Sequence, residues 1–251
     1  MSLNHIAREG FGGAISTVRT NPLLTGIVTT AVVGFAWTIN DFVDWRSFGT
    51  GGTPPTWAGY WKMTKLRIKA LLDNDDLLDT SVYSKSGQAY LIDLPIRATR
   101  RPKLMPRILP QRQVPERVLS TASQSRLHNI VTSLAAAHPE VFEVKPSHTE
   151  GRTTEGLYAR RDLDTLNPIA RDPILDHEIA HAHSSDDSLH VWLGDRDAAQ
   201  VVEKGWGQRF CLPFVNKGWV MIYAPRNLEE VEVVEQIVKA AAQFITGLEF
   251  K

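Results

Sequence analysis

The chain has 251 residues and a mass of 28.1 kDa, with 43% hydrophobic and 22% charged residues, values that exclude a disordered, fibrous or repetitive protein. Its 28 basic residues balance 28 acidic ones, which excludes a nucleic-acid binder that works by bulk positive charge. A single cysteine, Cys211, excludes internal disulfides and favours a reducing compartment.

A stretch of 21 residues without a charge runs from Thr20 to Asn40. A helix needs roughly 20 residues to cross the apolar core of a bilayer. A buried core helix or a cleaved signal peptide is the alternative, but Asp41 and Asp44 follow the stretch where a signal peptide has small residues. We therefore predict that residues 1–48 hold a single-pass membrane anchor, in the endoplasmic reticulum with the remaining chain facing the cytosol.

Residues 49–56 are rich in glycine and proline and predict a linker. Thr56 is a suitable N-cap for a helix that begins at Trp57, and residues 57–251 are expected to form one domain. Within it, the segment from Pro95 to Arg117 contains seven basic residues, one acidic residue and five prolines. The prolines exclude a regular helix or central strand there. A solvent-exposed loop that crosses the protein surface is the simpler interpretation. Contact of this loop with anionic lipid headgroups or an anionic substrate is the alternative.

Later segments alternate between helical and strand patterns. Residues 123–137 and the segment from Asn227 to Gly247 have helical spacing, and Asp195 is a suitable cap for a helix that ends at Gly205. Strands are expected at 141–144, 157–160 and 219–223, and residues 178–193 alternate about a polar turn, as a β-hairpin does. The order predicts an α+β fold with a mainly antiparallel sheet and flanking helices.

The predicted hairpin gathers histidines. With an even number of residues in its loop, one face carries His181, His183, His190 and Trp192, and small or aliphatic side chains cover the other face. His177 to His181 matches the H-E-x-x-H zinc signature, but that signature needs a helix.

Two interpretations of the histidines stay open. His181, His183 and His190 with Glu178 form a cupin-like set of ligands for iron, manganese or zinc, although strand alternation turns Glu178 away from His181 unless a bulge intervenes. In the other interpretation, which we favour, the imidazoles act as acids, bases or hydrogen-bonding groups without a metal.

Six runs of sequence carry a resemblance to a known family. They are Asp93-Leu94-Pro95, Thr99-Arg100-Arg101-Pro102, Gln111-Arg112-Gln113, Glu178-Ile179-Ala180-His181, Lys204-Gly205-Trp206-Gly207-Gln208-Arg209 and Tyr223-Ala224-Pro225-Arg226-Asn227. Together they resemble the fungal luciferase family, over about residues 90–246. That family contains the enzyme of luminous mushrooms that oxidises 3-hydroxyhispidin, and relatives from fungi that do not glow. We expect a relative from a non-luminous fungus.

Two positions depart from the family pattern. Phe210 follows Arg209 where the luminous enzymes have a histidine, and His177 stands before Glu178 where an arginine is common. The change at Phe210 removes a candidate proton-transfer group or substrate contact.

The resemblance implies a cofactor-independent oxygenase that adds O₂ to a flat pyrone or polyphenol and loses CO₂ from an endoperoxide. A homologue that binds an aromatic or lipid ligand at a membrane without turnover, or a histidine-ligated metal enzyme, is the alternative. Candidate catalytic residues are Glu178, His181, His183 and His190 for proton transfer, and Arg209 and Arg226 for anionic oxygen. Candidate substrate contacts are Trp192, Trp206, Gln208, Phe210, Trp219 and Tyr223. No nucleotide motif is present, and the oligomeric state is not encoded in any of these patterns.

Overall fold

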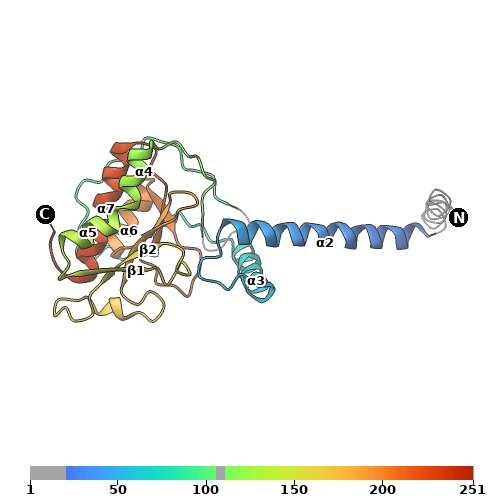
Figure 1. Cartoon of the computed structure of the whole chain (residues 1–251), viewed down its shortest axis with the longest axis horizontal. Coiled ribbons are helices and arrows are strands. Elements are labelled where there is room, and N and C mark those ends of the chain that lie inside the picture. Colours follow the sequence, from blue (N-terminus) through green and yellow to red (C-terminus); the bar gives the residue numbers. More distant parts are fainter. Residues whose placement is uncertain (1–20, 106–110, 251) are drawn as a thin grey trace. The chain divides into compact units, whose positions relative to one another are not determined.

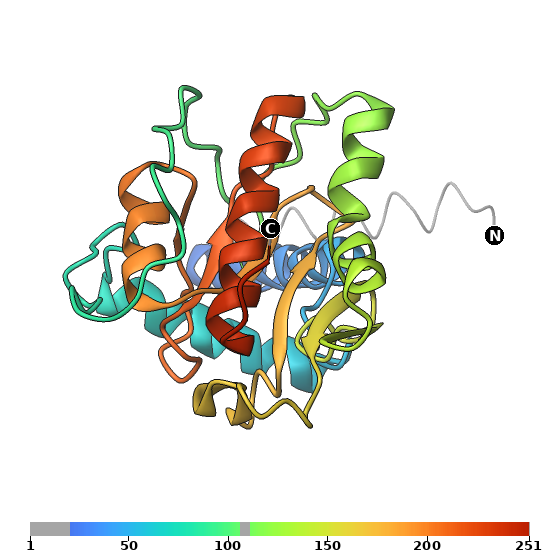
Figure 2. The same ribbon diagram turned by 90° about the vertical axis from the view of Figure 1, so that its left-hand side faces the viewer.

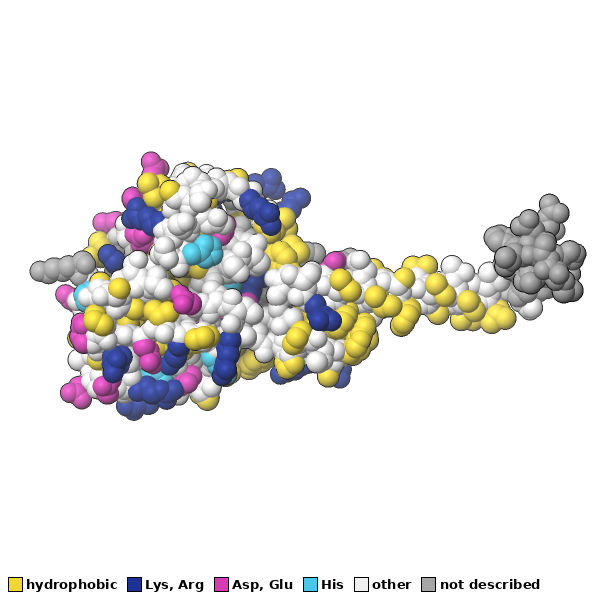
Figure 3. Space-filling view, viewed as in Figure 1, with side chains coloured by type: hydrophobic (Ala, Val, Ile, Leu, Met, Phe, Trp, Pro, Cys, Tyr) yellow, Lys and Arg dark blue, Asp and Glu magenta, His cyan; other side chains and the backbone are white. Residues whose placement is uncertain are grey.

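The computed structural model describes residues 21–105 and 111–250, and the chain divides into two compact units, Met1–Ser47 and Phe48–Lys251. Helix α2 (Pro22–Phe48) supplies most of the described part of the first unit, and only its last residue belongs to the second (Figure 1). It is long and apolar enough to cross a membrane, with a mean hydropathy of 1.6 over an 18-residue window. Figure 3 shows its hydrophobic side chains exposed along its length, and Leu23 and Phe35 are 78% and 69% exposed.

The second unit is built on one six-stranded sheet in the order β1-β2-β3-β4-β6-β5, with every neighbouring pair antiparallel. The strands are β1 (Phe142–Pro146), β2 (Glu155–Ala159), β3 (Glu178–Ala182), β4 (Leu189–Trp192), β5 (Gly207–Arg209) and β6 (Trp219–Ile222). The helices are α3 (Trp57–Asp73), α4 (Thr121–His128), α5 (Ile130–Ala137), α6 (Asp195–Glu203) and α7 (Leu228–Thr246), with a 3₁₀ turn at Pro168–Arg171. The predicted α+β fold is confirmed.

Helices α4, α5, α6 and α7 cover one face of this sheet, and α7 crosses its middle (Figure 2). Buried side chains recur along α7 every three or four residues, for example Val231, Val234, Ile237 and Val238. They belong to the same core as Ala180, Ala182, Leu189 and Val191 of the central strands. The central hairpin therefore turns its small and aliphatic face toward α7 and its histidines to the opposite face of the sheet.

Most of the predicted helix ends are confirmed. The side chains of Thr56 and Asn227 cap α3 and α7 by accepting hydrogen bonds from backbone N–H groups, and Gly247 ends α7 with a φ of 69°. The prediction for Asp195 is wrong, since Gly194 holds the cap position of α6. The Asp195 carboxylate instead accepts a hydrogen bond from the Ser84 backbone at 2.7 Å. The short strand β5 was not predicted from the sequence.

The basic segment has no helix or strand in its described residues, 95–105 and 111–117, apart from an isolated bridge between Leu104 and Gln113. The absence of regular elements there agrees with its prolines. The predicted solvated crossing is wrong for two of its arginines, because Arg97 and Arg112 are buried and paired with Glu230 and Glu150. Buried guanidinium groups need such partners to offset the loss of hydration. Arg97 and residues 111–113 are thus packed into the second unit, while Arg100, Arg101, Lys103 and Arg117 stay exposed.

Candidate functional site

The central hairpin brings the three predicted histidines together. His181 lies directly opposite His190, flanked by the pairs Ala180–Val191 and Ala182–Leu189. His183 begins the loop of residues 183–188, and its backbone N–H donates to the Ser188 carbonyl at 2.8 Å. The expected register is therefore confirmed, with the imidazoles on one face.

A bulge in β3 turns Glu178 to the same face. Leu157 pairs with Ala180 and Tyr158 pairs with Glu178, so that Ile179 is the extra residue. Alternation alone would point the Glu178 carboxylate to the other side of the sheet. The bulge brings its Oε1 to 2.8 Å from Nδ1 of His181, with both side chains fully buried.

The Glu178 carboxylate accepts further hydrogen bonds from the Ser147 hydroxyl (2.6 Å), the Thr149 hydroxyl (3.0 Å) and the Tyr158 hydroxyl (3.0 Å). Burial alone would raise the pKa of Glu178, but the hydrogen bonds and the contact with His181 outweigh it and hold the pKa below its usual value. Burial and the nearby Glu178 charge raise the pKa of Tyr158. Glu178 is thus an ionised group that fixes the orientation of His181.

Three ring nitrogens converge at the centre of the site. His181 Nε2 lies 3.1 Å from His183 Nε2, His183 Nε2 lies 3.2 Å from His190 Nδ1, and His190 Nδ1 lies 3.4 Å from His181 Nε2. Burial lowers the pKa values of His183 and His190 well below the usual value, with the charges of Arg112 and of neighbouring histidines acting in the same direction. Both imidazoles are therefore neutral near pH 7.

Two outer partners hold His183 in place. Its Nδ1 lies 2.8 Å from the Ser188 hydroxyl, which in turn donates to Asp186 Oδ2 at 2.9 Å.

The Trp219 ring stacks on His190 with its centroid 5.7 Å away, and it also contacts the ring of His181 at 5.6 Å. We call His181, His183 and His190 the histidine cluster.

Sequence reasoning missed two charged residues beside this cluster. Glu150 Oε2 lies 3.7 Å from His181 Nε2 and 3.9 Å from His183 Nε2, while its other oxygen accepts from Arg112. Both side chains are almost fully buried. Arg112 stands in the Gln111-Arg112-Gln113 run, and Glu150 lies in the polar turn between β1 and β2. Neither residue has a sequence spacing from the hairpin that would predict contact with its histidines.

The two predicted arginines lie elsewhere. The Arg209 guanidinium pairs with Asp75 and donates to the Asp76 carbonyl. The Arg226 guanidinium makes two hydrogen bonds of 2.6 and 2.7 Å to Glu116 at the surface. Neither is among the residues that contact the histidine cluster.

The predicted substrate contacts divide into separate groups. Trp192 lies opposite Trp219 across β4 and β6, and both are buried next to the histidines. Trp206 and Tyr223 instead surround the guanidinium of Arg97, at 5.6 and 5.7 Å from their ring centroids. Gln208 belongs to this second group because it accepts a hydrogen bond from the Tyr223 hydroxyl at 2.9 Å.

Phe210 connects the histidine cluster to a pocket. Its ring meets His190 edge to face, with centroids 4.9 Å apart. The same residue lines a pocket of about 350 Å³ between α3 and the segment after β5. The apolar part of that lining includes Leu66, Ala70, Leu77, Phe210, Leu212 and Phe214. Such walls suit a flat aromatic ligand.

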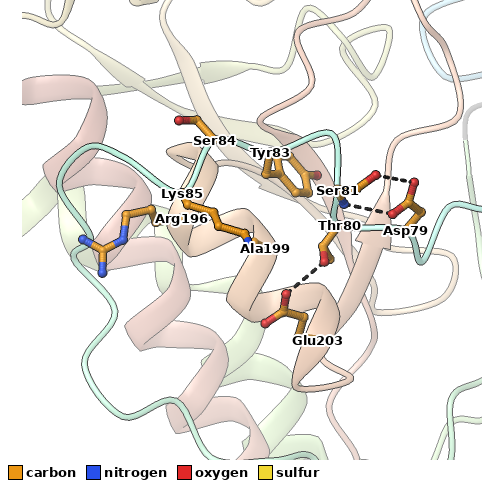
Figure 4. Close-up of a pocket in the computed structure, with 9 residues that line it drawn as sticks. All are labelled: Asp79, Thr80, Ser81, Tyr83, Ser84, Lys85, Arg196, Ala199 and Glu203. Atoms are coloured by element: carbon orange, nitrogen blue, oxygen red, sulfur yellow. Dashed lines mark hydrogen bonds between the residues drawn. The ribbon is translucent and has the colours of Figure 1, made fainter.

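A second pocket, of about 790 Å³, lies between α6 and residues 79–85 and is drawn in Figure 4. Its walls are polar, and two of its hydrogen bonds join Thr80 to Glu203 and Ser81 to Asp79. None of the predicted site residues lines it. The apolar pocket at Phe210 is therefore the better candidate for an aromatic molecule.

Comparison with known proteins agrees with this geometry. A luciferase domain matches residues 176–241, which contain the hairpin, α6, β5 and β6. The chain is 28% identical to a luciferase of Neonothopanus nambi over 91% of its own length and 89% of the relative, and 27% identical to a luciferase of Armillaria mellea over 88% and 86%. No solved structure matches. The chain is similar to fungal luciferases over most of its length.

Proposed function

We propose that the protein is a luciferase-like oxygenase that uses O₂ to oxidise a flat, electron-rich pyrone or polyphenol such as 3-hydroxyhispidin. The convergence of three buried imidazoles, one of them held by an ionised carboxylate, is the observation that carries this proposal. The luciferases to which the chain is similar support it. Groups with perturbed pKa values cluster at functional sites.

The proposed reaction begins when a hydroxyl group of the substrate loses its proton to a ring nitrogen of the histidine cluster. The resulting enolate gives up electrons to O₂ and forms a carbon–oxygen bond, which leaves a peroxide anion. That anion attacks the lactone carbonyl to close an endoperoxide, which then loses CO₂. His181 is the ring best placed for the first step, because the ionised Glu178 carboxylate accepts from its Nδ1 and balances the positive charge that the ring gains. The proposed co-substrate is O₂, and no organic cofactor takes part.

In this proposal the substrate occupies the apolar pocket, and Phe210 separates it from His190. The Phe210 ring has to turn before a substrate atom reaches an imidazole nitrogen. Arg209 also lines this pocket, but its guanidinium is engaged by Asp75. We therefore assign proton transfer to the histidines and no catalytic role to Arg226, which is paired with Glu116.

A second candidate is a protein that binds an aromatic ligand without turnover. The side chains of His181 and His183 are 0% and 1% exposed, and the Phe210 ring covers His190 edge to face. In this second function the pocket holds the ligand while the Phe210 ring keeps it from the cluster.

Mixing the purified full chain with 3-hydroxyhispidin in air separates the two candidates. The oxygenase predicts loss of substrate absorbance with repeated turnover, with or without light. Ligand binding alone predicts quenching of tryptophan fluorescence with the substrate recovered intact. If the substrate is neither bound nor consumed, both candidates are wrong for this compound.

For α2 we propose a role as a single-pass anchor in the membrane of the endoplasmic reticulum, with residues 48–251 on the cytosolic side. Its length of 27 residues and the mean hydropathy of 1.6 over an 18-residue window support the proposal. Extraction of cell membranes at alkaline pH tests it. The full chain is expected in the pellet, and a variant with Val28, Val32 and Phe35 changed to Asp is expected in the supernatant. Recovery of both in the supernatant contradicts the anchor.

A further inference from the structure

We propose that the histidine cluster binds one divalent transition metal ion, through Nε2 of His181, Nε2 of His183 and Nδ1 of His190, with Glu150 as the fourth ligand. The three nitrogens lie within 4.8 Å of one another in a buried group, and the free oxygen of Glu150 lies 3.7 and 3.9 Å from the nitrogens of His181 and His183. The proposal rests on this geometry alone. In the metal-bound chain the three nitrogens are ligands, so the proton transfer proposed above applies to the metal-free chain.

The distances between the three nitrogens match a coordination sphere. Metal–imidazole bonds of about 2.0 to 2.1 Å at tetrahedral angles place the nitrogens about 3.3 to 3.4 Å apart. The observed separations are 3.1, 3.2 and 3.4 Å. One ion at the centre of this triangle reaches all three nitrogens at once.

Outer hydrogen bonds direct two lone pairs to the same point. Nδ1 of His181 donates to the Glu178 carboxylate, which leaves its Nε2 unprotonated in the neutral ring. The Ser188 hydroxyl donates to Asp186, and Ser188 therefore accepts from Nδ1 of His183, which leaves Nε2 of His183 unprotonated as well. Two bare nitrogens 3.1 Å apart repel each other unless a cation lies between them. Carboxylate or hydroxyl partners on the far nitrogen are typical of metal-bound histidines.

Glu150 supplies the remaining donor. Its Oε2 is buried and has no hydrogen-bond partner among the described residues. This oxygen faces the unprotonated nitrogens of His181 and His183, at 3.7 and 3.9 Å. Since a buried carboxylate oxygen without a partner carries a large desolvation cost, a cation beside it removes an otherwise unfavourable arrangement. Arg112 holds the other oxygen and so fixes the direction of Oε2.

The donor set selects the class of metal. Three neutral imidazoles and one carboxylate suit zinc, iron, manganese or cobalt, whereas calcium and magnesium prefer an all-oxygen environment. A proton on His190 Nδ1 that is shared with Nε2 of His181 and Nε2 of His183 is the competing explanation for the approach of the rings. Such a proton leaves Glu150 Oε2 without a partner, whereas a metal ion engages it as well.

Titration of the full chain with Co²⁺ tests the proposal. The protein is prepared in detergent without a histidine tag and stripped with a chelator. We expect saturable binding of one equivalent, with visible absorption bands of a four- or five-coordinate nitrogen-rich site. The His183→Ala variant is expected to bind at least ~100-fold more weakly, and Ser188→Ala, which leaves all four ligands in place, ~10- to 100-fold more weakly. His138→Asn is the matched control, since His138 lies outside the cluster beside Phe142 and Phe250.

A spectroscopic count keeps the test valid if the alanine variants do not fold. Spin-echo measurements on the Cu²⁺-loaded wild-type chain detect the remote nitrogen of each bound imidazole. Three imidazoles support the proposal and any smaller number overturns it. Absence of saturable Co²⁺ binding to the wild-type chain, or equal binding by wild type and a folded His183→Ala variant, also overturns it. None of these readouts needs substrate, so failure of the oxygenase assay leaves their outcome unaffected.

Discussion

Glu178 accepts a hydrogen bond of 2.8 Å from His181 although the two residues stand three positions apart in one strand. The bulge at Ile179 makes this contact possible by bringing both side chains to the same face. The orientation of the histidine cluster therefore depends on a local irregularity of β3, and changes near the bulge are expected to disturb it.

Replacing Glu178 with glutamine tests how far this carboxylate supports the second unit. The variant loses the charge that holds five donors, one of which is the His181 ring. We expect the free energy of unfolding to fall by about 2 to 3 kcal/mol, because hydrogen bonds to charged groups contribute about 1.5 to 3 kcal/mol. Chemical unfolding followed by tryptophan fluorescence measures the change. Glu155→Gln, an exposed substitution on the neighbouring strand, is the control and is expected to leave stability unaltered within about 0.5 kcal/mol.

Gly156 faces the bulge and has no room for a side chain. A Cβ atom there would lie 2.9 Å from both Glu178 Oε1 and a ring carbon of Tyr158. Gly156→Ala is expected to lower the free energy of unfolding by about 1 to 3 kcal/mol through overpacking. Gly34→Ala serves as the comparison, since a Cβ atom there meets no atom within 4 Å. Equal stability of the Gly156→Ala variant and wild type in thermal unfolding contradicts the described packing.

The ion pair of Arg112 and Glu150 predicts an asymmetry between single and double substitutions. Arg112→Met leaves the buried Glu150 charge without its guanidinium partner and is expected to cost about 3 to 5 kcal/mol. The double variant Arg112→Met/Glu150→Leu removes both charges and is expected to be more stable than Arg112→Met alone. The unfolding free energies of the three proteins in metal-free buffer measure this. A double variant less stable than Arg112→Met means that Glu150 is stabilised by other contacts.

Much of the fold follows from local patterns in the sequence. The alternation of residues 178–193 predicts the hairpin and the common face of His181, His183 and His190, as the structure confirms. An alternating pattern does not show whether a strand contains a bulge. The side of the sheet on which Glu178 lies could therefore not be predicted, because it depends on the bulge at Ile179. Glu150 and Arg112 come from loops separated from the hairpin in the chain and reach it only through tertiary packing. Arg209 and Arg226 were predicted to lie in the site, but acidic residues distant in sequence pair with both of them elsewhere.

Phe210 is expected to control access to the histidine cluster. Phe210→Ala removes the ring between the apolar pocket and His190 and is expected to raise the rate of 3-hydroxyhispidin oxidation by ~10-fold or more, since about 1.4 kcal/mol of barrier corresponds to tenfold in rate. Phe214→Ala changes the same residue type in the same pocket, where the ring is 55% exposed, and is expected to have little effect. Initial rates of substrate loss measure both. A lower rate for Phe210→Ala, with the fold retained, means that the ring positions substrate.

The Cys211 thiol is expected to react slowly with thiol reagents. Burial raises its pKa to about 12, against an ordinary value of about 8.5, and the reactive thiolate is scarce at pH 8. We expect the native chain to react with an aromatic disulfide reagent ~100-fold or more slowly than the urea-unfolded chain, and the native rate to rise about tenfold per pH unit between pH 7 and 9. A native rate equal to the unfolded one means that the thiol is freely exposed and ordinary in pKa.

The fate of labelled oxygen tests the central claim, that the histidine cluster performs oxygenase chemistry, most directly. The wild-type chain and its His181→Ala variant are each given 3-hydroxyhispidin under ¹⁸O₂, with product mass and released CO₂ measured and folding checked by circular dichroism. We predict labelled product and one CO₂ per substrate consumed for wild type, and a rate at least ~100-fold lower for the variant, as removal of a proton-transfer group costs about 10²- to 10⁴-fold. Unlabelled product from wild type, or equal rates for the two folded proteins, contradicts it.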